Sequence, residues 1–359
     1  MGEKEVLQGL KDMMKAVEAD EAAFQNLALQ LFQYQYRHNP PYRRFCQSRG
    51  RTPRIVKDWW EIPAVPMRAF KEATLSCNDP AEAEAVFMTS GTTRPGKRGK
   101  HVHPTLDIYN RSMLRNFRQR FMGARDVLSM GILFPRPETL PHSSLAHYLS
   151  LAVREFGGEH SSYLVDGEEV HFSRLLHFLR EAERSGEPCA LLGASFHFVH
   201  VMDFLEQEGL SFRLPEGSRI LDTGGLKGQS RHVDPDVFYA GLAARFGVPR
   251  HRCINMYGLT ELSTQFYDDG NETVPSKKSG PCWIRTRVID PVSGEDVPYG
   301  ETGVLVHYDL ANVHSVLAVM TEDWGKAVEG GFILMGRAEG AEARGCSLAA
   351  EEFLRSSKG

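Results

Sequence analysis

Apolar side chains recur with two different periods along the chain, and each period predicts a different element. Phe24, Leu27, Leu31 and Tyr34 follow one another at steps of three and four residues. That spacing places them on one face of an α-helix, so we predict a helix over residues 5–36. The sequence Asn39-Pro40-Pro41 is expected to end this helix, because proline cannot continue one.

The middle of the chain alternates short apolar runs with longer amphipathic stretches. The runs typical of strands are 85–88, 127–134, 161–165, 190–192 and 219–221. The stretches with helical spacing are 105–121, 143–156, 172–184, 198–207 and 234–246. Strands that alternate with helices usually form a parallel sheet covered by helices. We therefore predict an α/β fold with a largely parallel sheet.

A change of pattern near residue 283 divides the chain further. Short strands and turns replace the helices, with strands expected at 285–289, 304–307, 316–320 and 332–335. The predicted organisation is an α/β core, a β-rich subdomain and a short C-terminal tail, at residues 1–282, 283–335 and 336–359. Within the core, residues 1–75 form a helical N-terminal segment.

Composition and charge exclude several classes of protein. The chain has 359 residues with 42 Lys and Arg against 46 Asp and Glu, so its net charge of −4 gives no sign of nucleic-acid binding. No apolar stretch of about 18 residues predicts a membrane span, and the polar start lacks the apolar stretch of a secretory signal. Six cysteines are scattered without metal-ligand spacing. We expect reduced thiols in a cytoplasmic protein.

A first candidate site is the loop of residues 89–100, which follows the predicted strand 85–88. It concentrates hydroxyls, glycines and cations, which suit phosphate oxygens better than they suit an ordinary surface turn. Gly91 and Gly96-Lys97 have the spacing of a Walker A motif. However, Arg98 stands where that motif needs Ser or Thr to bind magnesium, so the Walker interpretation fails.

Two later segments contain further candidate ligands for a nucleotide. In the first, Tyr257 offers a flat face for a base, Thr260 a hydroxyl for a phosphate and Glu261 a carboxylate for magnesium. In the second, Asp323 and Arg337 are spaced so that they could hold a ribose. Taken alone, the first segment is more commonly a Tyr-Gly turn with a satisfied Glu, and the alternative for the second is an ordinary β-hairpin with a surface Asp.

In this order and spacing, the three segments resemble the adenylate-forming superfamily of acyl-CoA synthetases, luciferases and adenylation domains. Residues 89–93 resemble its Thr-Ser-Gly-Thr-Thr loop, and residues 257–261 its Tyr-Gly-x-Thr-Glu motif. Gly224-Gly225 matches its Gly-Gly turn, and residues 300–305 are similar to its Gly-Glu-x-Gly-Glu-Leu strand entry.

Within the superfamily, the chain most resembles the acyl-protein synthetases of bacterial luminescence (LuxE) over nearly its whole length. This likeness rests on the segments 62–66, Phe70-Lys71, 222–225, 257–268 and 344–347. The resemblance implies an enzyme that uses Mg²⁺ and ATP to convert a carboxylic acid to an acyl-AMP. It also implies transfer of the acyl group to a cysteine and then to a partner reductase or carrier protein.

The resemblance also implies a role for each matching residue. The phosphates are expected to bind to Thr89, Ser90, Gly91, Thr92 and Thr93. The adenine is expected to lie against Gly224, Gly225, Tyr257 and Gly258, and the ribose to bind to Asp323 and Arg337. Thr260 is expected on the α-phosphate and Glu261 on magnesium. Cys346, a cysteine near the C-terminus beside Arg344, is expected to accept the acyl group, although a small residue in a turn explains it equally well.

One departure from the superfamily concerns a catalytic lysine. Larger relatives carry this lysine on a mobile C-terminal domain, which we expect to be missing or vestigial here. The loop cations Lys97, Arg98 or Lys100 would then stabilise the charge that develops on the phosphate. Lys97 is the residue that we assign to this role.

Other polar residues receive structural interpretations. Ser195 lies in a sequence that lacks the second glycine of a nucleophile elbow, so we interpret it as loop structure, with His197 lining the acyl pocket. The pairs His101/His103 and His197/His200 lack further metal ligands. Two other functions remain open: a CoA ligase of the phenylacetate type, and a nucleotide-binding scaffold without catalysis.

Overall fold

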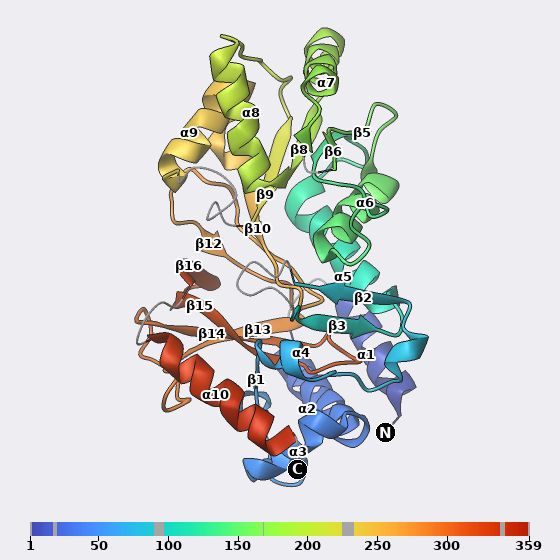
Figure 1. Ribbon diagram of the computed structural model, residues 1–359, viewed down its shortest axis with the longest axis vertical. Helices are drawn as coiled ribbons and strands as arrows, with labels where there is room; N and C mark the ends of the chain where they lie inside the picture. Colours follow the sequence, from blue (N-terminus) through green and yellow to red (C-terminus); the bar gives the residue numbers. More distant parts are fainter. Residues whose placement is uncertain are drawn as a thin grey trace. The chain divides into compact units, whose positions relative to one another are not determined.

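The computed structural model describes residues 2–16, 20–89, 97–167, 169–224, 233–337 and 342–357 (Figure 1). The chain forms two compact units. The first comprises Met1–Arg115, Leu259–Gln265 and Ser279–Gly359, and the second comprises Asn116–Gly258 and Phe266–Lys278. The β-rich segment 283–335 therefore belongs to the same unit as the N-terminal residues, and the expected core 1–282 contributes to both units.

The N-terminal segment contains three helices where we predicted one. They are α1 (Glu3–Lys15), α2 (Glu21–His38) and α3 (Pro40–Ser48). Asn39 ends α2 and also caps α3, because its side chain accepts a hydrogen bond from the backbone N–H of Tyr42. Pro40 suits the first position of a helix, where its missing N–H is not needed and its φ is already helical. The prolines therefore start a new helix as well as end the previous one.

An antiparallel sheet forms the centre of the first unit and confirms the strands predicted after residue 283. Its consecutive strands β13, β14, β15 and β16 pair in sequence order, and the short β1 runs parallel to β15. Their bounds are Ile284–Ile289, Thr302–Asp309, Ala318–Val328, Gly331–Arg337 and, for β1, Val65–Pro66. A separate hairpin joins β2 (Ala85–Met88) to β3 (Lys100–His103). The helix α4 (Ala69–Glu72) lies between β1 and β2 in sequence.

The second unit contains the predicted parallel sheet, in the order β11-β10-β9-β8-β4-β5. All neighbours are parallel except β11, which runs antiparallel to β10. The strands are β4 (Ser129–Leu133), β5 (Ser162–Tyr163), β8 (Cys189–Ala194), β9 (Arg219–Thr223), β10 (Cys253–Tyr257) and β11 (Phe266–Tyr267). The helices are α6 (Ser144–Phe156), α7 (Phe172–Ser185), α8 (Ser195–Gln207) and α9 (Pro235–Phe246).

The remaining elements are short or connect the larger ones. The helix α5 (Asp107–Phe117) continues as a π-helical turn at Arg118–Met122. Short strands are β6 (Val165–Asp166), β7 (Glu169–Val170) and β12 (Lys277–Lys278), and 3₁₀ turns occur at Trp59–Glu61, Pro80–Glu82 and Arg250–Arg252. Among the described residues, no helix is both long and apolar enough to cross a membrane.

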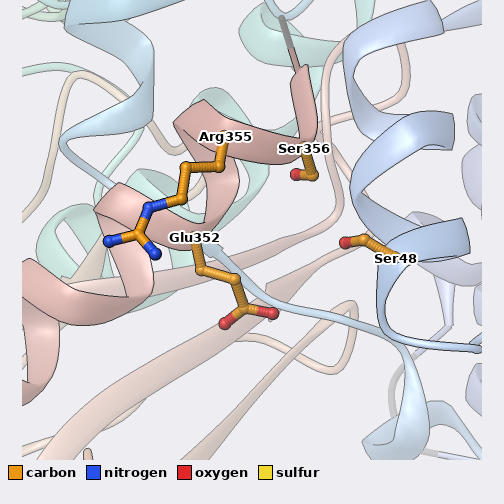
Figure 2. Close-up of a pocket in the computed structure, with 4 residues that line it drawn as sticks. All are labelled: Ser48, Glu352, Arg355 and Ser356. Atoms are coloured by element: carbon orange, nitrogen blue, oxygen red, sulfur yellow. The ribbon is translucent and has the colours of Figure 1, made fainter. Parts of the chain in front are cut away.

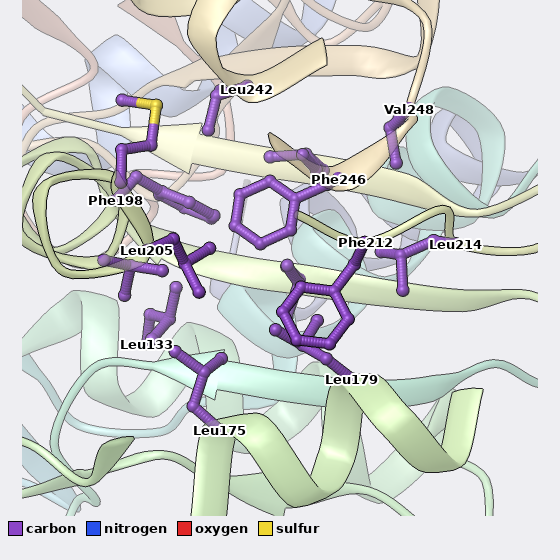
Figure 3. Packing of buried hydrophobic residues seen from close by; sticks show 14 of the residues in the cluster. Leu133, Leu175, Leu179, Phe198, Leu205, Phe212, Leu214, Leu242, Phe246 and Val248 are labelled. Atoms are coloured by element: carbon purple, nitrogen blue, oxygen red, sulfur yellow. The ribbon is translucent and has the colours of Figure 1, made fainter. Parts of the chain in front are cut away.

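Buried side chains from α7, α8 and α9 form the core of the second unit against its sheet. Figure 3 shows Leu179, Phe198, Leu205 and Phe246 from these helices packed together, and all four have at most traces of exposed surface. Full burial of each such side chain contributes about 1.5–3 kcal/mol. This packing fixes the carboxyl ends of β8, β9 and β10, the edge at which ligands bind in sheets of this kind.

The expected C-terminal tail is largely helical: α10 spans Glu342–Ser357. Its second half is docked on α3, where the rings of Phe353 and Phe45 lie 5.1 Å apart and Arg49 donates two hydrogen bonds to Glu352. Ala, Leu, Glu and Arg dominate residues 348–355, and these residue types favour helices. Cys346 falls within α10, but its side chain lies outside the described part of the structure.

Candidate active site

Thr89 and Gly99 are hydrogen-bonded to each other at the base of the predicted phosphate loop, next to the ends of β2 and β3. The Thr89 N–H donates to the Gly99 carbonyl at 3.0 Å, and the Gly99 N–H donates to Thr89 Oγ1 at 3.0 Å. Within the loop, Ser90, Gly91, Thr92 and Thr93 lie outside the described residues. The hairpin therefore defines where this loop leaves and re-enters the first unit.

Glu261 lies against the base of this loop. A Cβ atom added at Gly99 would lie 3.1 Å from Thr89 Cγ2 and 3.5 Å from Glu261 Oε1. Gly99 therefore packs tightly against Thr89 and lies at van der Waals distance from the Glu261 carboxyl group. Two of the three segments selected from the sequence meet at this point, although about 160 residues separate them in the chain.

Among the described residues, the buried Glu261 carboxyl group has fewer hydrogen-bond partners than a buried acid normally has. The residue is 2% exposed, and its Oε1 has no hydrogen-bond partner among the described residues. The pKa of Glu261 is raised to about 7, mainly by burial and to a smaller extent by Asp323, against the opposing effects of its own backbone N–H and the charges of Arg337 and Lys71. Burying a carboxylate oxygen without a hydrogen bond costs free energy. A buried acceptor of this kind is typical of a position that binds a ligand.

Asp323 and Arg337 are direct cross-strand neighbours on β15 and β16. Arg337 Nε lies 3.6 Å from Asp323 Oδ1, and the Asp323 side chain is almost buried, whereas that of Arg337 is more than half exposed. The charges of Asp323 and Arg337 also act on the Glu261 carboxyl group, which lies near Gly99 and Thr89 in the same unit.

Two lysines near this cluster have different surroundings. Lys97, the residue that we assigned to the phosphates, forms an ion pair of 2.6 Å with Glu72, and its side chain is 68% exposed. Lys71, which the sequence analysis did not select as a site residue, acts on the Glu261 carboxylate through its charge. The signal for Lys71 was its place in the Phe70-Lys71 segment of the family resemblance.

The expected adenine-binding residues belong to the second unit, at the carboxyl ends of β9 and β10. Tyr257 ends β10 and is 8% exposed, and Gly258 follows it on the surface. Gly224 follows β9 with a φ of +85°, a left-handed conformation that favours glycine. Gly225 lies outside the described residues.

Ser195 is part of a buried network rather than of a loop. It begins α8, and its hydroxyl donates to Asp222 Oδ2 at 2.7 Å. Tyr239 and Asn255 also donate to this carboxylate, while burial raises the pKa of Asp222 to about 6. We conclude that Ser195 supports the β9 end from which Gly224 follows, and that the loop interpretation was wrong. His197 is buried on α8, and its expected role in an acyl pocket stays a prediction.

Neither a cluster of metal-binding side chains nor a surface hollow adds a residue to the candidate site in the described part of the chain. In the described ranges, no group of three or more His, Cys, Asp or Glu side chains could hold a metal ion. A surface hollow of about 450 Å³ lies between α3 and α10 and is lined by Ser48, Glu352, Arg355 and Ser356 (Figure 2). None of the candidate site residues lines this hollow.

Comparison with known sequences gives one family and two curated relatives. The acyl-protein synthetase family LuxE matches residues 10–355. A long-chain-fatty-acid–luciferin-component ligase of Vibrio harveyi is 25% identical over 296 residues, which are 82% of this chain and 76% of the relative. Its counterpart in Aliivibrio fischeri is 23% identical over 307 residues, which are 83% and 78% of the two chains.

Comparison with solved structures gives the fold. The chain is similar to an open conformation of 2-hydroxyisobutyryl-CoA ligase in complex with an acyl-AMP and CoA, with a TM-score of 0.65 and 16% identity over 88% of this chain and 69% of that one. It is also similar to the phenylalanyl-adenylate complex of McyG A-PCP, with a TM-score of 0.53 and 16% identity over 73% and 42%. The adenylate-forming fold expected from the sequence is confirmed.

Proposed function

Because the chain belongs to the LuxE family of acyl-protein synthetases, we propose that it activates a carboxylic acid with Mg²⁺ and ATP as an acyl-AMP. It then transfers the acyl group to a thiol of its own, that of Cys346. The names of the curated relatives make a long-chain fatty acid the first candidate substrate. From Cys346 the acyl group would pass to a partner reductase or carrier protein.

The observation that carries this proposal is the carboxyl group of Glu261. It is buried at the base of the phosphate loop, its Oε1 lacks a partner among the described residues, and two cations act on it. Magnesium in nucleotide sites is usually held by one or two carboxylates and the phosphates of the substrate. The Glu261 carboxylate fits this arrangement, and Mg²⁺ bound there would offset the negative charge of the phosphates.

The remaining residues would bind and orient the nucleotide. Thr89 and the following residues up to Thr93 would surround the β- and γ-phosphates, and Thr260 would donate to the α-phosphate. Asp323 would accept hydrogen bonds from the ribose hydroxyls. Gly224, Gly225, Tyr257 and Gly258 would border the adenine. Lys97, Lys71 and Arg337 supply positive charge, which favours a transition state with charge spread over phosphate oxygens.

The first step needs no protein base, since the acid is already ionised at neutral pH. A carboxylate oxygen attacks the α-phosphorus of ATP, and the bond from that phosphorus to the bridging oxygen breaks. Pyrophosphate leaves with the bonding electrons. The protein contributes by holding the two reactants in line and by stabilising charge.

In the second step the thiolate of Cys346 attacks the carbonyl carbon of the acyl-AMP. The carbon–oxygen bond to AMP breaks, AMP leaves with that oxygen, and the proton of the thiol has already gone to solvent. The other five cysteines are poor candidates, because burial raises their pKa values, that of Cys46 to about 12 and that of Cys189 to about 11. Thiols held protonated are weak nucleophiles.

An ATP–pyrophosphate exchange screen tests the proposed function. Labelled pyrophosphate is incubated with the protein, Mg²⁺, ATP and one acid at a time, from fatty acids of increasing chain length to aromatic and amino acids. We expect label in ATP only when an acid of one class is present. ATP binding without exchange for any acid would favour a nucleotide-binding scaffold without catalysis.

The proposed ribose contact predicts a specific loss of ATP affinity. Asp323→Ala should weaken ATP binding by roughly 10- to 150-fold (about 1.5–3 kcal/mol), the usual range for a hydrogen bond to a charged group. Isothermal titration with ATP measures the effect. Asp296→Ala, which removes an exposed acid paired with Arg287 in the same unit, is the control and should change affinity less than twofold. Equal affinities for Asp323→Ala and wild type would exclude the contact.

A further inference from the structure

Three buried polar side chains, all from the first unit, hold the turn of residues 260–264 that carries Glu261. They are His101 on β3, Asp309 at the end of β14, and Asn312 in the connection between β14 and β15. Their exposed fractions are 2%, 0% and 1%. Buried polar side chains are normally hydrogen-bonded, and most of the hydrogen bonds of these three go to groups of this one turn.

Asn312 bonds to two backbone groups that directly follow the Glu261 side chain in the chain. Its Nδ2 donates to the Glu261 carbonyl at 2.9 Å, and its Oδ1 accepts from the Ser263 N–H at 2.9 Å. A second hydrogen of Nδ2 goes to the Val316 carbonyl at 3.1 Å. The amide group of one side chain therefore fixes the backbone that carries the carboxylate.

Asp309 holds the following residues of the same turn. Its Oδ2 accepts from the N–H groups of Ser263 and Thr264 at 3.0 and 2.9 Å. Its Oδ1 accepts from the Thr264 hydroxyl at 2.8 Å and from the Ala311 N–H at 2.9 Å. Four donors surround this carboxylate, and each needs an acceptor because the site is buried.

His101 holds the start of the turn. Its Nδ1 lies 2.9 Å from the Thr260 carbonyl oxygen. Since a carbonyl oxygen can only accept, Nδ1 carries the hydrogen and donates it. The turn is thus anchored before, at and after Glu261.

The connection that carries Asn312 is itself anchored to α2. Gln35 Nε2 donates to the Asn312 carbonyl at 2.7 Å, and Gln35 Oε1 accepts from the Leu317 N–H at 2.9 Å. Gln35 is fully buried. Asn312 therefore cannot move with the turn without breaking bonds to a separate helix.

We propose that Asn312 and Asp309 are positioning residues that set the Glu261 carboxylate in place for Mg²⁺–ATP, an inference that rests on the proposed role of Glu261. The free-energy cost of burying a carboxylate oxygen that has no partner among the described residues is incurred when the protein folds. The carboxylate then needs little reorganisation when the metal and phosphates bind. Neither residue is expected to touch the substrate.

Asn312→Ala tests the proposal with two readouts that do not depend on turnover. Amide hydrogen exchange of residues 260–265 should accelerate by about 5- to 100-fold, because the bond to the Glu261 carbonyl is lost and the Ser263 N–H keeps only Asp309 as its acceptor. Isothermal titration should show a similar fold loss of affinity for Mg²⁺–ATP. The affinity for ATP in excess chelator should change less than twofold, since the proposed role acts through the metal ligand.

Asn271→Ala is the matched control, because Asn271 is equally buried and donates to the Cys253 carbonyl within the second unit. It should lower thermal stability and leave Mg²⁺–ATP affinity unchanged. If Asn312→Ala lacks a cooperative thermal transition, Asp309→Asn replaces it. That variant keeps the shape of the side chain but turns an NH₂ group towards donors.

Two results would overturn the inference. One is a folded Asn312→Ala or Asp309→Asn variant that binds Mg²⁺–ATP with wild-type affinity. The other is an Asn271→Ala variant that loses as much Mg²⁺–ATP affinity as Asn312→Ala. Failure of the proposed function has a different signature, because wild-type protein would then show no acid-dependent pyrophosphate exchange. The binding and amide-exchange measurements would still decide the inference in that case.

Discussion

Replacing Glu261 with glutamine is expected to slow acid-dependent pyrophosphate exchange by about 10²-fold or more. Glutamine keeps the shape of the side chain but removes the charge that would bind magnesium at the base of the phosphate loop. Loss of one preorganised charge contact typically has an effect of this size. Exchange rates measured at saturating ATP, acid and Mg²⁺ give the result directly.

The same variant should not weaken the fold. Burial raises the pKa of Glu261 from 4.5 to about 7, so the folded state takes up a proton that the unfolded state releases. Wild-type stability therefore falls as the pH rises from about 4.5 to 7, and the glutamine variant should lack this loss. Without ATP and Mg²⁺, we expect its thermal midpoint at pH 7.5 to equal or exceed that of wild type.

Glu21→Gln is the control for charge removal as such, because Glu21 is an exposed partner of Arg285 in the same unit. Its exchange rate should stay within twofold of wild type. A folded Glu261→Gln protein that exchanges at the wild-type rate would remove Glu261 from the site.

Replacing Cys346 with serine is expected to abolish the acyl-enzyme while leaving pyrophosphate exchange intact. Exchange reports only formation of the acyl-AMP, and the thioester needs a thiolate. After incubation with ATP, Mg²⁺ and the acid found in the screen, wild-type protein should gain one acyl mass on the peptide that contains Cys346. Hydroxylamine should remove that mass.

Cys282→Ser provides the matched control, because Cys282 is a partly buried cysteine. Burial raises its pKa, so it should not compete for the acyl group, and its variant should acylate normally. Label on any cysteine other than Cys346, or normal acylation of Cys346→Ser, would show that the C-terminal helix has only a structural role.

The sequence predicted elements well where local pattern decides them. Strands such as 85–88 and helices such as 172–184 lie within one or two residues of β2 and α7. The errors involve signals with two meanings. Pro40, for example, ends one helix and starts another.

The candidate site was predictable only in part, for a physical reason. Thr89, Glu261 and Asp323 stand in motifs whose order suggests a shared ligand; Glu261 lies near Gly99 and Thr89, and the charge of Asp323 acts on it. Asp309 and Asn312 belong to no such motif. Their importance comes from burial and from bonds to residues nearly 50 positions away, which no local pattern reveals.

The central claim is that the acid is activated by attack of its own oxygen on the α-phosphorus, before the acyl group reaches Cys346. Incubation of the protein with ATP, Mg²⁺ and a carboxylic acid labelled with ¹⁸O in both oxygens tests this most directly. We predict AMP that carries one ¹⁸O atom and an acyl group on Cys346 that retains the other. Label in inorganic phosphate together with ADP, or AMP without ¹⁸O, would contradict the account.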